Sequence, residues 1–71
     1  IDLNLKDNNY LDIYIVDING QEINKIFKGY QTSGKYNYKW DASLISSGIY
    51  FIFIKELKNE DIIFKKICLI R

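Results

Sequence analysis

Few residues of this 71-residue chain could carry out chemistry, because the chain has one cysteine and no histidine. Cys68 lies in an apolar segment, where a thiol usually behaves as a small buried hydrophobic group. The carboxylates Asp7, Glu60 and Asp61 lie in turn-like segments, which is typical of solvated side chains. Catalysis needs a nucleophile, an acid or base, and a group that orients them. No such set is recognisable, so we expect neither an enzyme nor a cofactor.

A row of aromatic residues is the candidate for a ligand-binding surface. Tyr36, Tyr38 and Trp40 alternate with polar residues over positions 35–40. A flat aromatic face can stack on sugars or bases, but such a row more often packs into a core, and this is the interpretation we favour. A solvent-exposed Trp40 would instead support a carbohydrate platform. The polar segments 6–9 and 58–61 lack the spacing of calcium-binding loops.

Charge and composition exclude several classes of partner. The chain has 10 basic and 9 acidic residues, a balance that makes no electrostatic case for nucleic acid. Its longest apolar run, 49–54, is far shorter than the roughly 20 residues of a membrane span, so we expect no membrane insertion. One cysteine forms no internal disulfide, so apolar packing must stabilise a single domain over residues 1–71. Because no Met begins the chain, we expect it to be the tail of a larger protein.

Apolar residues recur with a period of two, which predicts β-strands throughout. Asn19-Gly20 between two apolar runs predicts a type I′ hairpin. The run 49–54 is apolar on both faces, so we expect both faces to be covered, either in a central strand or with one face packed under a loop. Gly48 before it would suit a bulge or tight entry. Strands spaced about 10 residues apart indicate an all-β, antiparallel β-sandwich of six to seven short strands. We expect these strands at 1–5, 10–18, 21–27, 35–40, 49–54 and 62–70.

Three segments, taken in order, resemble a known family. They are "IYIVDINGQEI", "GKYNYKWDASLISSGIYFIFI" and "FKKICLIR", and together they are similar to the C-terminal sorting domain (type A) of type IX secretion cargo proteins. The chain departs from the family pattern at Val16, where an aromatic residue is common, and it has no Pro-Asn-Pro segment before the first strand. The immunoglobulin-like domain of flagellar hook-capping proteins is related but usually has a longer insertion after the Trp-Asp pair. The matching residues are Asp17, Gly20, Gln21, Gly34, Tyr36, Trp40, Asp41, Ala42, Ser43, Ser47, Gly48, Tyr50, Phe51, Lys65, Lys66, Ile67, Leu69 and Arg71.

The resemblance implies an immunoglobulin-like fold and a non-catalytic role as a secretion signal. Such a domain folds in the periplasm of a Gram-negative bacterium and directs an upstream cargo domain to the cell surface or the medium. Its implied partners are the outer-membrane translocon, a shuttle protein and a sortase-like peptidase that removes it during surface attachment. The alternative is a structural or adhesive β-sandwich module, of hook-capping or carbohydrate-binding type.

We expect the last strand and the loop before Gly48 to be recognised by the secretion machinery. If that strand lies at a sheet edge, its open backbone groups can pair with an extended partner. The alternatives are that Gly48, Tyr50 and Ile67 serve folding alone, and that Lys65 and Lys66 only protect the edge against aggregation. The predicted recognition residues are Gly48, Tyr50, Lys65, Lys66, Ile67, Leu69 and Arg71.

Overall fold

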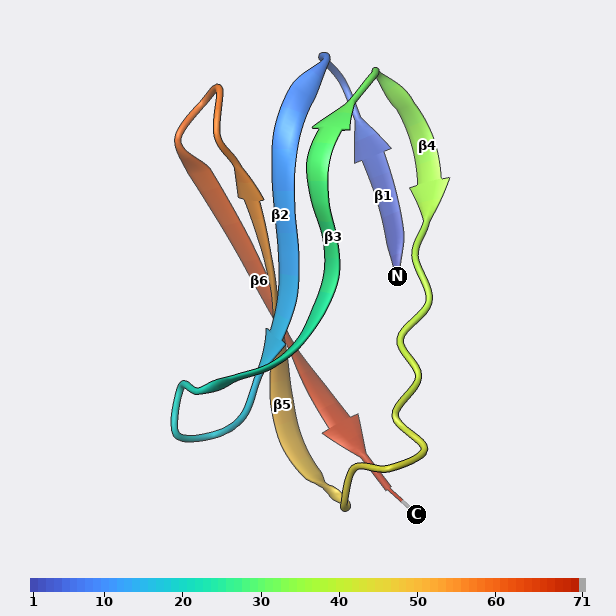
Figure 1. Cartoon of the computed structure of the whole chain (residues 1–71), viewed down its shortest axis with the longest axis vertical. Helices are drawn as coiled ribbons and strands as arrows, with labels where there is room; N and C mark the ends of the chain where they lie inside the picture. The colour runs from blue at the N-terminus through green and yellow to red at the C-terminus, as the bar shows by residue number, and fades with distance from the viewer. Residues whose placement is uncertain (71) are drawn as a thin grey trace.

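A computed structural model of the chain, which describes residues 1–70, shows two antiparallel sheets packed face to face (Figure 1). The predicted all-β sandwich is therefore confirmed, and the described residues form six strands. They are β1 (Asp2–Leu5), β2 (Asn9–Val16), β3 (Glu22–Gln31), β4 (Gly34–Asn37), β5 (Gly48–Glu56) and β6 (Asp61–Leu69).

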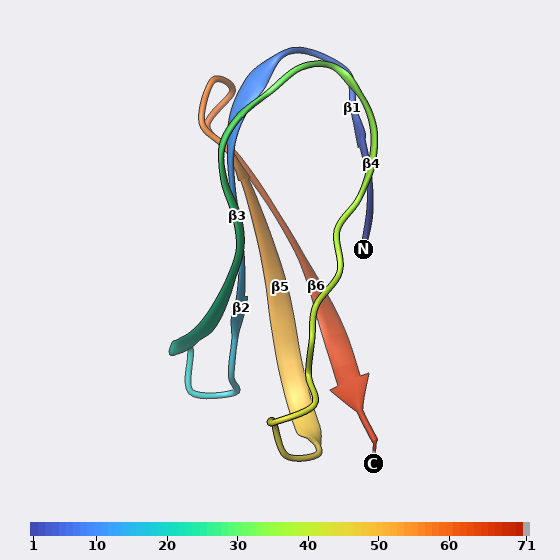
Figure 2. The same cartoon turned by 45° about the vertical axis from the view of Figure 1, so that its right-hand side comes forward.

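The larger sheet has the strand order β3-β2-β5-β6, and the smaller one pairs β1 with β4. β2 and β5 are central strands, whereas β3 and β6 form the two edges. The small sheet packs over the inner face of the large one (Figure 2), but residues 61–66 of β6 stay exposed. The large sheet therefore has one edge that the second layer covers less completely.

The core lies between the sheets and uses every second residue of the strands that face inward. Leu11, Ile13 and Ile15 of β2 are fully buried, because β2 has a strand on each side and the small sheet in front of it. Burying one such side chain contributes about 1.5–3 kcal/mol. The core cluster also contains Leu3, Leu5, Tyr50, Ile52 and Ile54.

β5 is a central strand, as predicted, but no further layer of residues 1–70 covers its outer face. Phe51 and Phe53 on that face are only half-buried. Their cover comes from neighbouring strands: Phe53 stacks on Tyr14 of β2 with ring centroids 5.4 Å apart, and on Phe64 of β6 at 5.6 Å. The expectation of two covered faces was therefore wrong, since cross-strand aromatic stacking stabilises an outer face without burying it.

The β2–β3 hairpin forms at Asn19-Gly20, but its turn is not type I′. Gly20 has φ +83°, whereas Asn19 does not adopt a positive φ. The Gly20 amide donates to the Asp17 carbonyl at 3.0 Å, and the Asp17 amide donates to the Gln21 carbonyl at 2.9 Å. This pattern is a type I turn followed by a left-handed glycine, the three-residue hairpin loop. The Asp17 carboxylate accepts from the amides of Asn19 and Gln21 and thereby selects this turn.

The sequence G-x-Y occurs at the start of two strands, and in both the tyrosine hydroxyl makes the same kind of hydrogen bond to the backbone. The Tyr50 hydroxyl donates to the Ser46 carbonyl at 2.7 Å, and the Tyr36 hydroxyl donates to the Thr32 carbonyl at 2.6 Å. In both cases the ring folds back over the preceding glycine, and a Cβ built on Gly48 would lie 3.7 Å from the Tyr50 ring. Gly48 pairs in regular register with Leu69 and has no positive φ, so the expected bulge is absent.

Two strands end at places that alternation alone did not predict. β3 continues to Gln31, where a loop was expected, because Gln31 still pairs with Asn9 of β2. β4 ends at Asn37, although the alternation continues to Trp40, because β1 supplies no partner beyond the two hydrogen bonds between Ile1 and Tyr38. Strand length is thus set by the partner strand.

Candidate recognition edge

β6 forms one edge of the large sheet, and most of its side chains are exposed. Its residues lie opposite those of β5, so Ile63 and Lys65 share the inner face with the buried Ile54 and Ile52. Phe64 lies on the outer face opposite Phe53. Because β5 occupies one side of β6, every second residue directs its backbone N–H and C=O toward the other, open side. Among residues 1–70, no strand pairs with that side.

The predicted recognition residues of β6 divide into two kinds. Lys65 and Lys66 are exposed, one on each face of the sheet, and no carboxylate of residues 1–70 forms an ion pair with either. Ile67 and Leu69 are half-buried and pack against the core cluster. Arg71 lies outside the described residues. A partner could therefore contact the two lysines directly, whereas the two apolar side chains mainly hold the strand on the core.

Gly48 and Tyr50 lie at the start of β5, beside the C-terminal end of β6. Gly48 is exposed, but the Tyr50 side chain is only 7% exposed and its ring lies edge-on to Trp40, with centroids 5.7 Å apart. A partner cannot contact the Tyr50 ring while the domain stays folded. Any contribution of Tyr50 to recognition must therefore act through the position of its neighbours.

The loop 41–47 is brought to the C-terminal end of β6, because Gly48 pairs with Leu69 (Figure 1). A turn within the loop is closed by hydrogen bonds from the Ile45 amide to the Ala42 carbonyl and from the Ser43 amide to the Asp41 carboxylate. Ile45 packs against the core, whereas Leu44 is 99% exposed. Sequence reasoning missed Leu44, although a large apolar residue within a polar loop is a signal that could have singled it out.

The aromatic row packs against the core, as the favoured interpretation predicted. Tyr36, Tyr38 and Trp40 are half-buried. Tyr36 stacks on Tyr38 at 6.1 Å and Phe27 lies against Tyr38 at 5.4 Å, so neighbouring rings occupy the faces that a sugar would need. The indole Nε1 of Trp40 is buried and has no hydrogen-bond partner among residues 1–70. This arrangement does not favour a carbohydrate platform.

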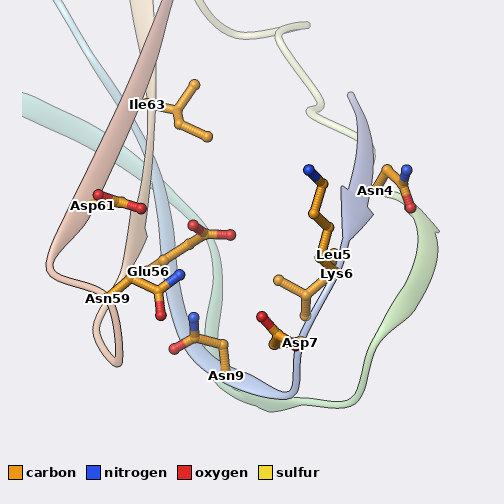
Figure 3. A pocket seen from close by; sticks show the side chains of 9 residues that line it. All are labelled: Asn4, Leu5, Lys6, Asp7, Asn9, Glu56, Asn59, Asp61 and Ile63. Carbon is orange, nitrogen blue, oxygen red and sulfur yellow. The ribbon is translucent and has the colours of Figure 1, made fainter.

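A polar groove of about 300 Å³ opens between the end of β1 and the start of β6 (Figure 3). In the close-up view, Lys6 and Asp7 lie on one wall, while Glu56 and Asp61 lie on the other. Among residues 1–70, no three acidic, cysteine or histidine side chains are close enough to hold a metal ion. The groove therefore has the character of a solvated gap between two layers.

Asn9 lies at the base of this groove and joins two distant parts of the chain. The residue is only 2% exposed, and its side-chain oxygen accepts a hydrogen bond from the Lys58 amide at 2.9 Å. Next to it, the Asn8 side-chain oxygen accepts from the Ser33 amide at 2.8 Å. These two bonds attach the turns before β4 and β6 to the start of β2, which fixes where β6 begins.

Two further groups clarify the chemistry of the outer face. Cys68 is exposed, so the prediction of a buried thiol was wrong, because an edge strand without a covering layer leaves its outer face open. The Asp12 carboxylate, hydrogen-bonded to Lys25 at 2.7 Å, raises the pKa of that lysine, and Lys25 also lies 5.1 Å from the centre of the Tyr14 ring. Within residues 1–70, no helix is long and apolar enough to cross a membrane.

A comparison with known protein families identifies the class to which this all-β chain belongs. The family model of the secretion system C-terminal sorting domain matches residues 1–70. The chain belongs to this family, the sorting domains of type IX secretion, and the resemblance seen in the three sequence segments is confirmed. Searches of curated proteins and of solved structures found no match. The domain is a secretion signal, a class not known for catalysis.

Proposed function

We propose that this domain directs an upstream cargo protein through the type IX outer-membrane translocon to the cell surface, and that the secretion machinery recognises strand β6. The observation that carries the proposal is the open edge of β6 in a member of the sorting family. An extended segment of the translocon or of its shuttle protein would pair with the open backbone groups of β6, and side chains would supply specificity. A sortase-like peptidase would then remove the domain in the course of surface attachment.

Two features support a recognition surface along the second half of β6, residues 65–69. The exposed Lys65 and Lys66 carry two positive charges with no carboxylate of residues 1–70 paired to them. The loop 41–47 lies beside the strand end and exposes Leu44. Together they offer charge, open backbone and an apolar contact within one region. Tyr50, Ile67 and Leu69 position this region from the core.

A secretion assay tests the proposal. Residues 1–71 are fused to the C-terminus of a signal-peptide-bearing fluorescent reporter in a bacterium with a type IX system. We expect delivery to the surface or the medium, and loss of delivery when residues 64–71 are removed. Removing residues 64–71 takes away six of the nine residues of β6 and also threatens folding, so the sharper variant is K65E/K66E, which changes only exposed side chains.

The matched control is K35E/K39E, which makes the same charge change on exposed residues of the small-sheet side. We expect the control to be delivered and the β6 variant to stay in the periplasm, with both melting like the parent domain. Equal delivery of the two variants would exclude a role for the β6 lysines. Retention of the unmodified fusion would favour a structural or adhesive module.

A further inference from the structure

The start of β6 carries a charge pattern that is complementary to itself when the strand is reversed. Residues 60–66 read Glu-Asp-Ile-Ile-Phe-Lys-Lys, that is, two acidic, three apolar and two basic residues. We infer that two copies of this chain associate by antiparallel pairing of their β6 edges, with Ile63 of each copy on a two-fold axis. The inference concerns association of the isolated chain and does not depend on the proposed export function.

This register brings opposite charges together twice. With Ile63 opposite Ile63, Asp61 of each copy lies opposite Lys65 of the other, and Glu60 lies near Lys66. Both lysines lack a carboxylate partner within residues 1–70, and in the single chain Asp61 lies opposite Glu56, so two like charges face each other. Opposite charges directly across a strand pair stabilise it, whereas like charges destabilise it. A second copy would therefore supply the counter-charge that β5 does not.

The same register covers the apolar side chains of the edge. Ile62, Ile63 and Phe64 are 56%, 41% and 63% exposed, although an open edge strand is usually protected by charge, proline or a bulge. Pairing would place Ile62 of each copy beside Phe64 of the other on the outer face, an aliphatic–aromatic cross-strand pair. Phe64 already stacks on Phe53, and the added side chain would cover its remaining side.

Other registers of self-pairing lack this match. An axis at Lys65 would place two ammonium groups opposite each other, and an axis at Phe64 would place Lys65 opposite Ile63 and Asp61 opposite Ile67. An isologous interface requires one patch that complements itself, which the Ile63 axis supplies. The paired segment, residues 61–65 of each copy, is short, so the association is weak and reversible. Because it uses the open edge of β6, it would compete with any other strand that docks there.

The test is the mass of the 71-residue chain in solution. Sedimentation equilibrium at about 10 µM to about 1 mM suits the expected affinity, since a weak dimer is populated only at concentrations near or above its dissociation constant. We expect the mass to rise from 8.4 kDa toward twice that value, and the rise to shrink when salt is added. A mass of 8.4 kDa at every concentration would overturn the inference.

Variants locate the axis. I63K should abolish the rise in mass, because it places two ammonium groups together, while the matched control I23K on β3, the opposite edge, should leave it unchanged. K65D alone should weaken the dimer, and D61K/K65D should restore it. Thermal melts of each variant test whether the fold is retained. Loss of the dimer in I23K but not in I63K would place the interface elsewhere.

Disulfide crosslinking tests the register of the two paired β6 strands directly. In the C68A background, I63C should form a symmetric disulfide rapidly, because directly opposed residues have Cα atoms about 4.5–5.5 Å apart, within disulfide range. In the unmodified chain, the two Cys68 thiols would be about 33 Å apart along the strands, so they should crosslink slowly. If K65C or Cys68 crosslinks faster than I63C, the proposed register is refuted.

Discussion

Tyr50 provides the sharpest test of the packing at the start of β5. Its side chain is 7% exposed, lies edge-on to Trp40 and donates to the Ser46 carbonyl at 2.7 Å. Replacing a buried aromatic ring with alanine costs about 3–5 kcal/mol. At about 0.05–0.15 kcal/mol per residue, a 71-residue domain has about 4–11 kcal/mol of stability in total. We therefore expect Tyr50→Ala to remove a large share of this stability and to lower the melting temperature markedly.

Tyr50→Phe separates the hydroxyl from the ring. It removes one hydrogen bond worth about 0.5–1.5 kcal/mol, and water can replace it because Ser46 is exposed. A loss of about 1 kcal/mol should lower the melting temperature by about 4–8 °C in a domain of this size. Urea unfolding and thermal melts followed by circular dichroism measure both effects. Tyr36→Phe is the matched control, and we expect a smaller loss because both contacts of its hydroxyl, with the Thr32 carbonyl and the Thr32 hydroxyl, are exposed.

A melting temperature of Tyr50→Ala equal to that of the parent would show that the ring is not buried and would refute the packing argument. If Tyr50→Phe is destabilised as strongly as Tyr50→Ala, the hydroxyl rather than the ring would carry the stability. Each outcome also bears on recognition, since a variant that unfolds cannot be used to argue that Tyr50 contacts a partner.

Two further substitutions test connections that hold the sheets in register. Asn9→Ala should cost about 1–3 kcal/mol of unfolding free energy, because it leaves the Lys58 amide without its acceptor at a buried site. Urea unfolding with an unchanged m-value would measure this loss. A loss within experimental error would show that water replaces the side chain. Gly20→Ala should cost about 1–2 kcal/mol, since its φ of +83° disfavours a Cβ, while Asn19→Ala should cost less. Comparable costs at the two positions would indicate a type I′ turn, in which both residues have a positive φ.

Much of this fold could be predicted from the sequence. The alternation of apolar and polar residues located most of the six strands, an unbroken apolar run located β5, and the turn-forming pair Asn19-Gly20 marked the first hairpin. Those signals are local, because side chains of a strand alternate between its two faces whatever its partners are. The turn type escaped prediction because the Asp17 carboxylate, two residues earlier, selects the type I turn.

Strand order is what only the tertiary structure decided. Both β5 and β6 contain consecutive large apolar residues, yet β5 is central and β6 is an edge. A strand's own residues do not specify how many neighbours it has, since backbone pairing depends on segments far away in the chain. For that reason the sequence identified the last strand as a candidate for recognition, but the exposure of Phe64 and Cys68 and the open pairing side of β6 followed from the assembled sheet.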